Sequence, residues 1–414
     1  MRNRVVCLWC VLSVLISAFV VDSAGQATAV SPVQAPVVTE AERKSIVAAT
    51  EALQPADIPV LLPKAEAGDA SAQYMLGVAY ADSKAVQKDP AQAWLWFQRS
   101  AEKGWPVGQN AVGTAYKSGM GVSRNEVEAV RWYRKAADQG YAQAQANLGV
   151  AYYEGLGVPQ DATEAVKWFR QAAEQENAFG QLWLGISYAE GHGVAGDMGQ
   201  ALIWFRKAAG QGEAKAEYNV GRIYDNGLGV SQDHSEAATW YRKAADHGNA
   251  DAQFDLAMAY HNGEGVHKDR EEAAKWLGKA SDQGSGRAST LLGEMYWNGE
   301  LGRAPIKRHI AMHEFEKGAK QGYPVAPLTL GEIYFKGWEF DRDYIKACTW
   351  FLIADDLDKA QTWGQTHPSD IAQLRKTLPS RISKTQEKLT PQQFAECQRQ
   401  AAEWASANSP KLSK

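Results

Sequence analysis

Cysteine is scarce in this chain, with four residues among 414. Cys7 and Cys10 fall in an apolar stretch near the N-terminus, so only Cys348 and Cys397 belong to the body of the chain. A framework of several disulfides is therefore excluded. In an oxidising compartment the two remaining cysteines could pair, and otherwise they would be buried thiols; the sequence leaves both outcomes open.

Neither sign of charge dominates. Lysine and arginine total 44 against 48 aspartate and glutamate residues, which gives a net charge of −4, and no stretch is rich in lysine and arginine. Proteins that bind nucleic acid usually carry a strong basic patch. We therefore expect no nucleic-acid partner.

Complete catalytic or metal-binding motifs are also missing. Ser100 and Lys103 spell Ser-x-x-Lys, the acylation motif of penicillin-recognising enzymes, but no Lys-Thr-Gly or Ser-Asp-Asn accompanies it. His309 and His313 are four residues apart on an expected helix, without a third ligand nearby. We predict a protein that is not an enzyme, with no catalytic residues, no cofactor and no metal.

The N-terminus has the pattern of an export signal. Arg2 and Arg4 precede an apolar run from Val5 to Val21, and small residues follow. We predict a signal peptide over residues 1–23; the alternative is an uncleaved anchor, because this run is at the short end of a membrane span. In both cases the body would be exported, to the periplasm or the outside, and would meet a membrane only through an uncleaved signal.

The chain is rich in one repeated pattern about 36 residues long. Its anchor is Leu-Gly-x-x-Tyr, which first occurs at residues 76–80. The eight anchor positions, which number the repeats from one to eight, are Gly77, Gly113, Gly149, Gly185, Gly221, Ala257, Gly293 and Gly331. A strict period of this length is typical of a solenoid, because each unit can bury its apolar face only by stacking on its neighbours.

Repeat three shows how one unit should fold. Helix A is expected over Ala142–Glu154 and should end at Gly155. Asp161 and Glu164 predict a capping box at the start of helix B, which carries a Trp-aromatic pair that ends in Phe169. Large rings opposite small residues would interlock the helices, and the anchor glycine suggests a close helix approach.

These motifs resemble the Sel1-like repeat family, a branch of the tetratricopeptide-type solenoids. The matching pattern is Leu-Gly-x-x-Tyr, Gly-x-Gly-Val, Asp-x-x-x-Ala-x-x-Trp-Phe/Tyr and Ala-Ala-x-x-Gly, over about residues 60–355. The resemblance implies an all-α fold, a right-handed α/α superhelical solenoid of about eight 36-residue repeats. Exported members of the family are typically adaptors, regulators, envelope assembly factors or host-interaction proteins.

The ends of the chain depart from the repeat, as capping units do. We expect a disordered spacer over residues 24–38, an N-terminal helical cap and half repeat over 39–68, repeats over 69–355, and a C-terminal cap and tail over 356–414. Thr390 should begin the last helix, which we expect to reach about Ala405.

Candidate binding positions follow from the columns of helix A. The positions six and two residues before the anchor, and one and five after it, vary most and share a helical face. In tetratricopeptide-type solenoids, which the chain resembles, this face lines the concave groove. In repeat four it carries Phe179, Trp183 and Ile186, and large apolar groups of this kind often mark interaction sites. The other candidate residues are Asn147, Lys215, Asn219, Arg222, Asp251 and Asp255. The alternative is that tight curvature of the solenoid buries this face against the neighbouring repeat.

The functional prediction is a non-enzymatic scaffold or adaptor of the cell envelope or secreted space that binds a protein partner in its groove. The alternative is an envelope protein that binds cell-wall glycan or peptide, or interacts with β-lactams, because aromatic grooves can hold sugars. Cysteine-rich relatives have been linked to β-lactam binding, but this chain lacks their repeat-stapling cysteines.

Overall fold

The computed structural model describes most of the body of the chain, namely residues 19–21, 27–29, 45, 48–50, 52–82, 85–302, 305–338, 341–360 and 368–412. The expected export signal, its cleavage and most of the spacer lie outside the described residues. Two short strands, β1 (Phe19–Val21) and β2 (Ala27–Ala29), pair antiparallel. In the part of the chain that is described, no helix is both long and apolar enough to cross a membrane.

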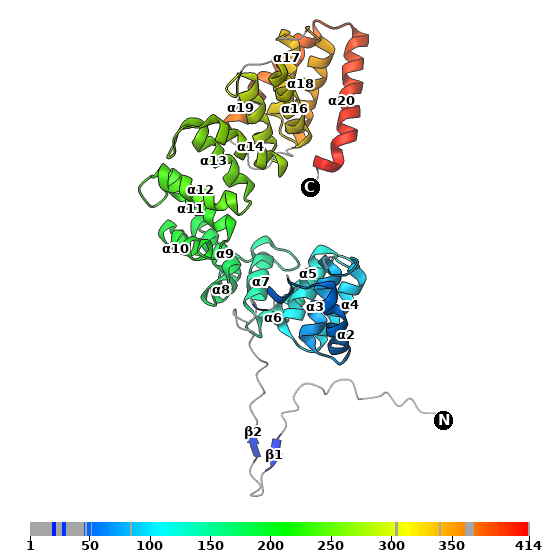
Figure 1. Cartoon of the computed structure of the whole chain (residues 1–414), viewed down its shortest axis with the longest axis vertical. Coiled ribbons are helices and arrows are strands. Elements are labelled where there is room, and N and C mark those ends of the chain that lie inside the picture. The colour runs from blue at the N-terminus through cyan, green and yellow to red at the C-terminus, as the bar shows by residue number, and fades with distance from the viewer. Residues whose placement is uncertain are drawn as a thin grey trace, which may run out of the picture. The chain divides into compact units, whose positions relative to one another are not determined.

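The other described elements are helical, and within each unit most helices pack on the next helix in sequence (Figure 1). The chain consists of two compact units, Met1–Gly180 and Gln181–Lys414. The first unit contains the 3-10 turn η1 (Pro55–Asp57) and helices α2 (Ile58–Glu66), α3 (Ala70–Asp82), α4 (Pro90–Glu102), α5 (Pro106–Ser118), α6 (Glu126–Ala137), α7 (Ala142–Glu154) and α8 (Ala162–Glu174). The boundary between the units falls within α9 (Ala178–Glu190).

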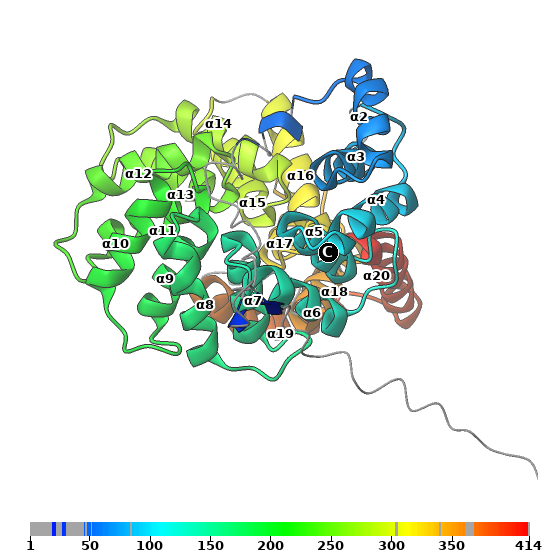
Figure 2. The same cartoon turned by 90° about the horizontal axis from the view of Figure 1, so that it is seen from below.

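The second unit continues the same alternation of helices A and B (Figure 2). Its helices are α10 (Met198–Ala209), α11 (Ala214–Asn226), α12 (His234–Asp246), α13 (Ala250–Asn262), α14 (Arg270–Asp282), α15 (Gly286–Trp297), α16 (Pro305–Lys320), α17 (Val325–Lys336), α18 (Tyr344–Ala360), α19 (Pro368–Gln386) and α20 (Pro391–Leu412). Repeat one is α3 with α4, and repeat eight is α17 with α18. The predicted all-α solenoid of consecutive helix pairs is confirmed.

Repeat three follows the sequence prediction except at one cap. Helix α7 has the expected bounds, and Gly155 ends it with φ +71°. The Asp161 side chain accepts a hydrogen bond from the Glu164 N–H at 2.9 Å. The predicted capping box is only half formed, however, because the Asp161 N–H donates to the Tyr152 carbonyl and the Glu164 carboxylate accepts from Trp168 Nε1 at 3.1 Å. The indole one turn along the helix therefore takes the place of the backbone donor.

The anchor glycines leave room for aromatic rings. A Cβ at Gly149 would lie 2.5 Å from two ring carbons of Phe169 on helix B of the same repeat. A ring sits equally close to the anchor glycine in the other repeats that have one: Gly77 with Phe97, Gly113 with Tyr133, Gly185 with Phe205, Gly221 with Tyr241, Gly293 with Phe315, and Gly331 with Phe351. Repeat six has Ala257 at this position, and the corresponding helix B residue is Leu277, in the same core cluster. A methyl group is thus present where the ring is absent.

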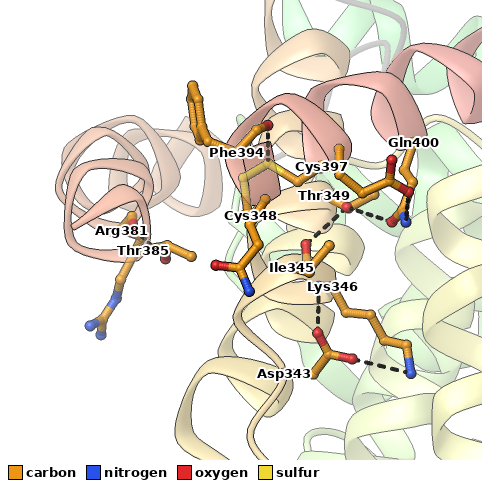
Figure 3. The surroundings of a disulfide bond; sticks show 12 residues. Asp343, Ile345, Lys346, Cys348, Thr349, Arg381, Thr385, Phe394, Cys397 and Gln400 are labelled. Atoms are coloured by element: carbon orange, nitrogen blue, oxygen red, sulfur yellow. Dashed lines mark hydrogen bonds and ion pairs between the residues drawn. A yellow bond between two sulfur atoms is a disulfide. The ribbon is translucent and has the colours of Figure 1, made fainter. Parts of the chain in front are cut away.

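A disulfide links the C-terminal helix to the last repeat. Helix α20 packs on α18, and a disulfide joins Cys348 to Cys397 with 5.9 Å between their Cα atoms (Figure 3). This decides between the two outcomes that the sequence left open for these cysteines. Thr390 and Gln393 form a complete capping box, with hydrogen bonds of 2.9 and 3.3 Å. Helix α20 ends at Leu412, later than expected.

Candidate binding cleft

The second unit contains a cleft of about 1260 Å³. Helices α11 and α12 of repeat five form one part of its wall, and α13 of repeat six forms another. The first residues of α15, the segment that joins α16 to α17, and three residues of α19 also line it, and α19 lies outside the repeats. The cleft is therefore lined by both helices of repeat five, by helix A of repeat six and by part of the C-terminal cap.

Two tyrosines and two aspartates form two hydrogen-bonded pairs in the cleft wall. The Tyr218 hydroxyl donates to Asp255 Oδ2 at 3.0 Å, and the Tyr241 hydroxyl donates to Asp225 Oδ2 at 3.3 Å. His234 Nδ1 lies 2.8 Å from Asp225 Oδ1. The two tyrosine rings are 5.8 Å apart and tilted by 37°. Three consecutive helices are thereby linked through polar groups of the cleft.

Two arginines of the cleft contact aromatic rings, and a third pairs with an aspartate outside the cleft lining. The Arg222 guanidinium lies 5.9 Å from the centre of the Tyr218 ring, and that of Arg287 lies 4.1 Å from the Phe254 ring. Arg375 on α19 pairs with Asp358 through its Nε at 2.9 Å. The cleft thus presents guanidinium groups, carboxylates and ring faces together.

Burial raises the pKa of the Asp255 carboxyl from its ordinary 3.8 to about 6. The hydrogen bond from Tyr218 and the positive charge of Arg287 oppose this shift, and the negative charges of Asp251 and Asp225 add to it. Burial also raises the pKa of Tyr218 and of Tyr241, and the nearby aspartates raise both further. Because folding raises the pKa of Asp255, its ionisation lowers the stability of the fold as pH rises from about 4 through 6.

Three of the candidate residues from the sequence line this cleft: Arg222, Asp251 and Asp255. Lys215 is exposed and Asn219 is half-buried on the same helix as Arg222, but neither is part of the cleft lining. Their involvement in binding stays a prediction.

The candidate residues of repeat four have packing contacts. Phe179 is half-buried against Ala142, Ala146 and Ala172. Ile186 packs on the core cluster that includes Leu182 and Val220, and Trp183 is half-buried. These contacts agree with the alternative that this face is used for packing, and a role in binding stays a prediction.

In repeat three, Asn147 donates to Asn110 Oδ1 at 2.9 Å. This bond connects helix A of repeat three with helix A of repeat two. Binding by Asn147 also stays a prediction.

Sequence reasoning missed much of the cleft wall. Tyr218 lies three residues before the anchor, in a column that is not among the four most variable ones. Tyr241 is the ring that faces the anchor glycine of its repeat, and the spacing of the repeat does not predict that its hydroxyl reaches Asp225. Arg375 could not be found by comparing repeats, since α19 lies outside the period. A detectable signal was the clustering of Asp225, Asp251 and Asp255 in two adjacent repeats.

A family model matches the chain at eight consecutive positions, in agreement with the repeated helix pairs of the fold. The model of the Sel1 repeat fits the chain at residues 70–105, 106–141, 142–177, 178–213, 214–249, 250–285, 286–323 and 330–357. The chain belongs to the Sel1 repeat family. The Sel1 repeats thus include every helix that forms the cleft except α19.

Solved structures of Sel1 repeat proteins are similar to the chain. One is a Sel1 repeat protein from Oxalobacter formigenes, 33% identical, which covers 59% of this chain and 96% of its own, with a TM-score of 0.52. Another is a protective antigen of uropathogenic Escherichia coli strains that displays an SLR fold, 28% identical, which covers 86% of this chain and 96% of its own, with a TM-score of 0.47. A search among curated proteins finds no match.

Proposed function

We propose that this chain is a non-enzymatic interaction scaffold that binds a segment of a protein partner in the cleft of repeats five to seven. The Sel1 repeat fold is commonly a scaffold for protein interactions. The observation that carries the proposal is the cleft itself, because its volume exceeds that of ordinary small-molecule pockets, roughly 300–1,000 Å³. A peptide segment matches a cleft of this size.

The chemistry of the cleft also favours a peptide. The half-buried Tyr218 offers aromatic surface, and aromatic residues are enriched at the energetic centres of protein interfaces. Arg222 and Asp251 are exposed on helices α11 and α13 and can form hydrogen bonds with a chain that enters the cleft. This mixture of rings and both charge signs is typical of a protein interface.

We further propose an exported location, in the periplasm or outside the cell. The N-terminal pattern supports export, and the disulfide between Cys348 and Cys397 supports an oxidising compartment. The competing proposal is an envelope protein that binds cell-wall glycan or peptide. The half-buried Tyr218 ring suits a sugar as well, so an experiment must separate the two proposals.

Display selection with random dodecapeptides on the full chain tests the proposed site. Asn262 is exposed and lines the cleft, so Asn262→Trp should obstruct it without disturbing the core. Thr239, exposed on α12 and absent from the cleft lining, supplies the matched control Thr239→Trp. Peptides selected on the parent should bind the control equally and lose at least tenfold in affinity for Asn262→Trp.

Equal binding to both variants would place the peptide site elsewhere. Failure to select any peptide, together with binding of soluble cell-wall fragments that Asn262→Trp abolishes, would establish the glycan alternative. Matching thermal unfolding of the three proteins is the control for folding.

A further inference from the structure

We propose that the cleft recognises a basic side chain, lysine or arginine, of the bound segment through Asp251 and Asp255. This inference rests on the proposed function and specifies the chemistry of the partner. Both aspartates belong to α13 and are four residues apart, so they lie on one face of the helix. Asp251 is exposed and Asp255 is half-buried, which arranges them from the mouth of the cleft inward.

Among the described residues, no ion pair includes Asp251 or Asp255. Asp225, on α11, differs because His234 Nδ1 lies 2.8 Å from one of its oxygens and the Tyr241 hydroxyl donates to the other. A shielded carboxylate without a cation is costly for the fold, and such groups are characteristic of functional sites.

The charged and titratable groups around Asp255 come from four helices. Tyr218 and Asp225 face it from α11, Tyr241 from α12, Asp251 from its own helix and Arg287 from α15. Arg287 favours the carboxylate, but it lies over Phe254, and its effect does not offset burial. Arg222 lies over Tyr218. The surroundings of Asp255 therefore favour an additional cation, which a bound segment can supply.

The same wall can hold the stem of a long basic side chain. The half-buried Tyr218 ring lies beside Asp255, because its hydroxyl donates to one oxygen of that carboxylate. Lysine and arginine bury their methylene stems on apolar surface while the charged end meets an acid. Aromatic faces add cation–π attraction for the same groups.

The test uses a fluorescein-labelled dodecapeptide from the selection, and compares each of its arginines with citrulline and each lysine with norleucine. At pH 7.5 the neutral replacement at one position should weaken binding to the parent at least tenfold, as measured by fluorescence anisotropy. Asp255→Asn should cause a similar loss. The two changes together should cost little more than one alone, since both remove the same charge pair.

Lower pH provides a second readout. Binding to the parent should weaken between pH 7.5 and pH 5, as Asp255 takes up a proton, while the affinity of Asp255→Asn should change little. This variant should also remain folded and be at least as heat-stable as the parent at pH 7.5, because it removes a shielded negative charge. Asp251→Asn should have a smaller effect on affinity, since Asp251 is exposed and more strongly screened by solvent.

Two outcomes would overturn this inference while leaving the proposed function intact. One is a set of cleft-dependent peptides without lysine or arginine. The other is a peptide that loses affinity for Asn262→Trp but binds Asp255→Asn and the neutral analogues as tightly as the originals. If no peptide depends on the cleft at all, the proposed function fails and this inference fails with it.

Discussion

Replacing Gly149 by alanine should lower the free energy of unfolding of the first unit by about 3 kcal/mol. The new Cβ would lie 2.5 Å from two carbons of the Phe169 ring, which is fully buried and cannot swing into solvent. Alanine favours a helix over glycine by about 1 kcal/mol, which is too little to offset the overlap. Urea unfolding followed by tryptophan fluorescence measures the loss.

A second substitution tests the cause of this loss. Repeat six combines Ala257 with Leu277, so Gly149→Ala together with Phe169→Leu reproduces a natural pair in repeat three. The double variant should be more stable than Gly149→Ala alone. If Gly149→Ala is neutral, or if the second change only adds to the damage, the glycine is not there to accommodate the ring.

Removing the disulfide should destabilise the C-terminal cap by about 4 kcal/mol. Cys348 and Cys397 are 49 residues apart in sequence, and the cross-link restricts the unfolded chain in proportion to the logarithm of that length. The double variant Cys348→Ala/Cys397→Ala should show faster hydrogen exchange in α18 and α20 and a lower unfolding temperature of the second unit.

Reduction supplies the matched control for the disulfide. Dithiothreitol should lower the stability of the parent to that of the double alanine variant, and should leave that variant unchanged. Unaltered exchange in α20 after reduction would mean that packing alone holds the cap, through Ile353, Leu357 and Ala401.

Much of the fold could be predicted because the repeat fixes local structure many times over. The pairing of glycine with a ring is also visible in the sequence once two columns of the repeat are compared. Phe169 and Phe205 follow Gly149 and Gly185 by 20 residues, and Leu277 follows Ala257 by the same interval. A single repeat would not have revealed this relation.

Competition between side chains limited the prediction of details. Glu164 was expected to cap the backbone, but Trp168 one turn later supplies a donor for its carboxylate. In α20, Thr390 and Gln393 each accept a hydrogen bond from the other's backbone N–H, and they form the complete capping box. When two donors can both approach one acceptor, the spacing of the residues does not predict which of them will form the hydrogen bond.

The candidate site was predicted only in part because it uses both repeated and unrepeated elements. Comparison of columns selected Arg222, Asp251 and Asp255, which line the cleft. It also gave weight to Phe179, whose contacts with the small residues of repeat three depend on helix distances that no column reveals. Helix α19 lies beyond the last repeat, so periodicity does not predict that its residues line the cleft.

Photo-crosslinking from inside the cleft is the most direct test of where a partner binds. Benzoylphenylalanine would replace Asn262 in the full chain, with Thr239 replaced in the control, and both proteins would be irradiated with envelope extract or culture fluid. We predict that position 262 becomes joined to one defined segment of a protein, that this segment carries lysine or arginine, and that position 239 yields none. Crosslinks of equal yield from both positions, or exclusively from position 239, would contradict a binding site in this cleft.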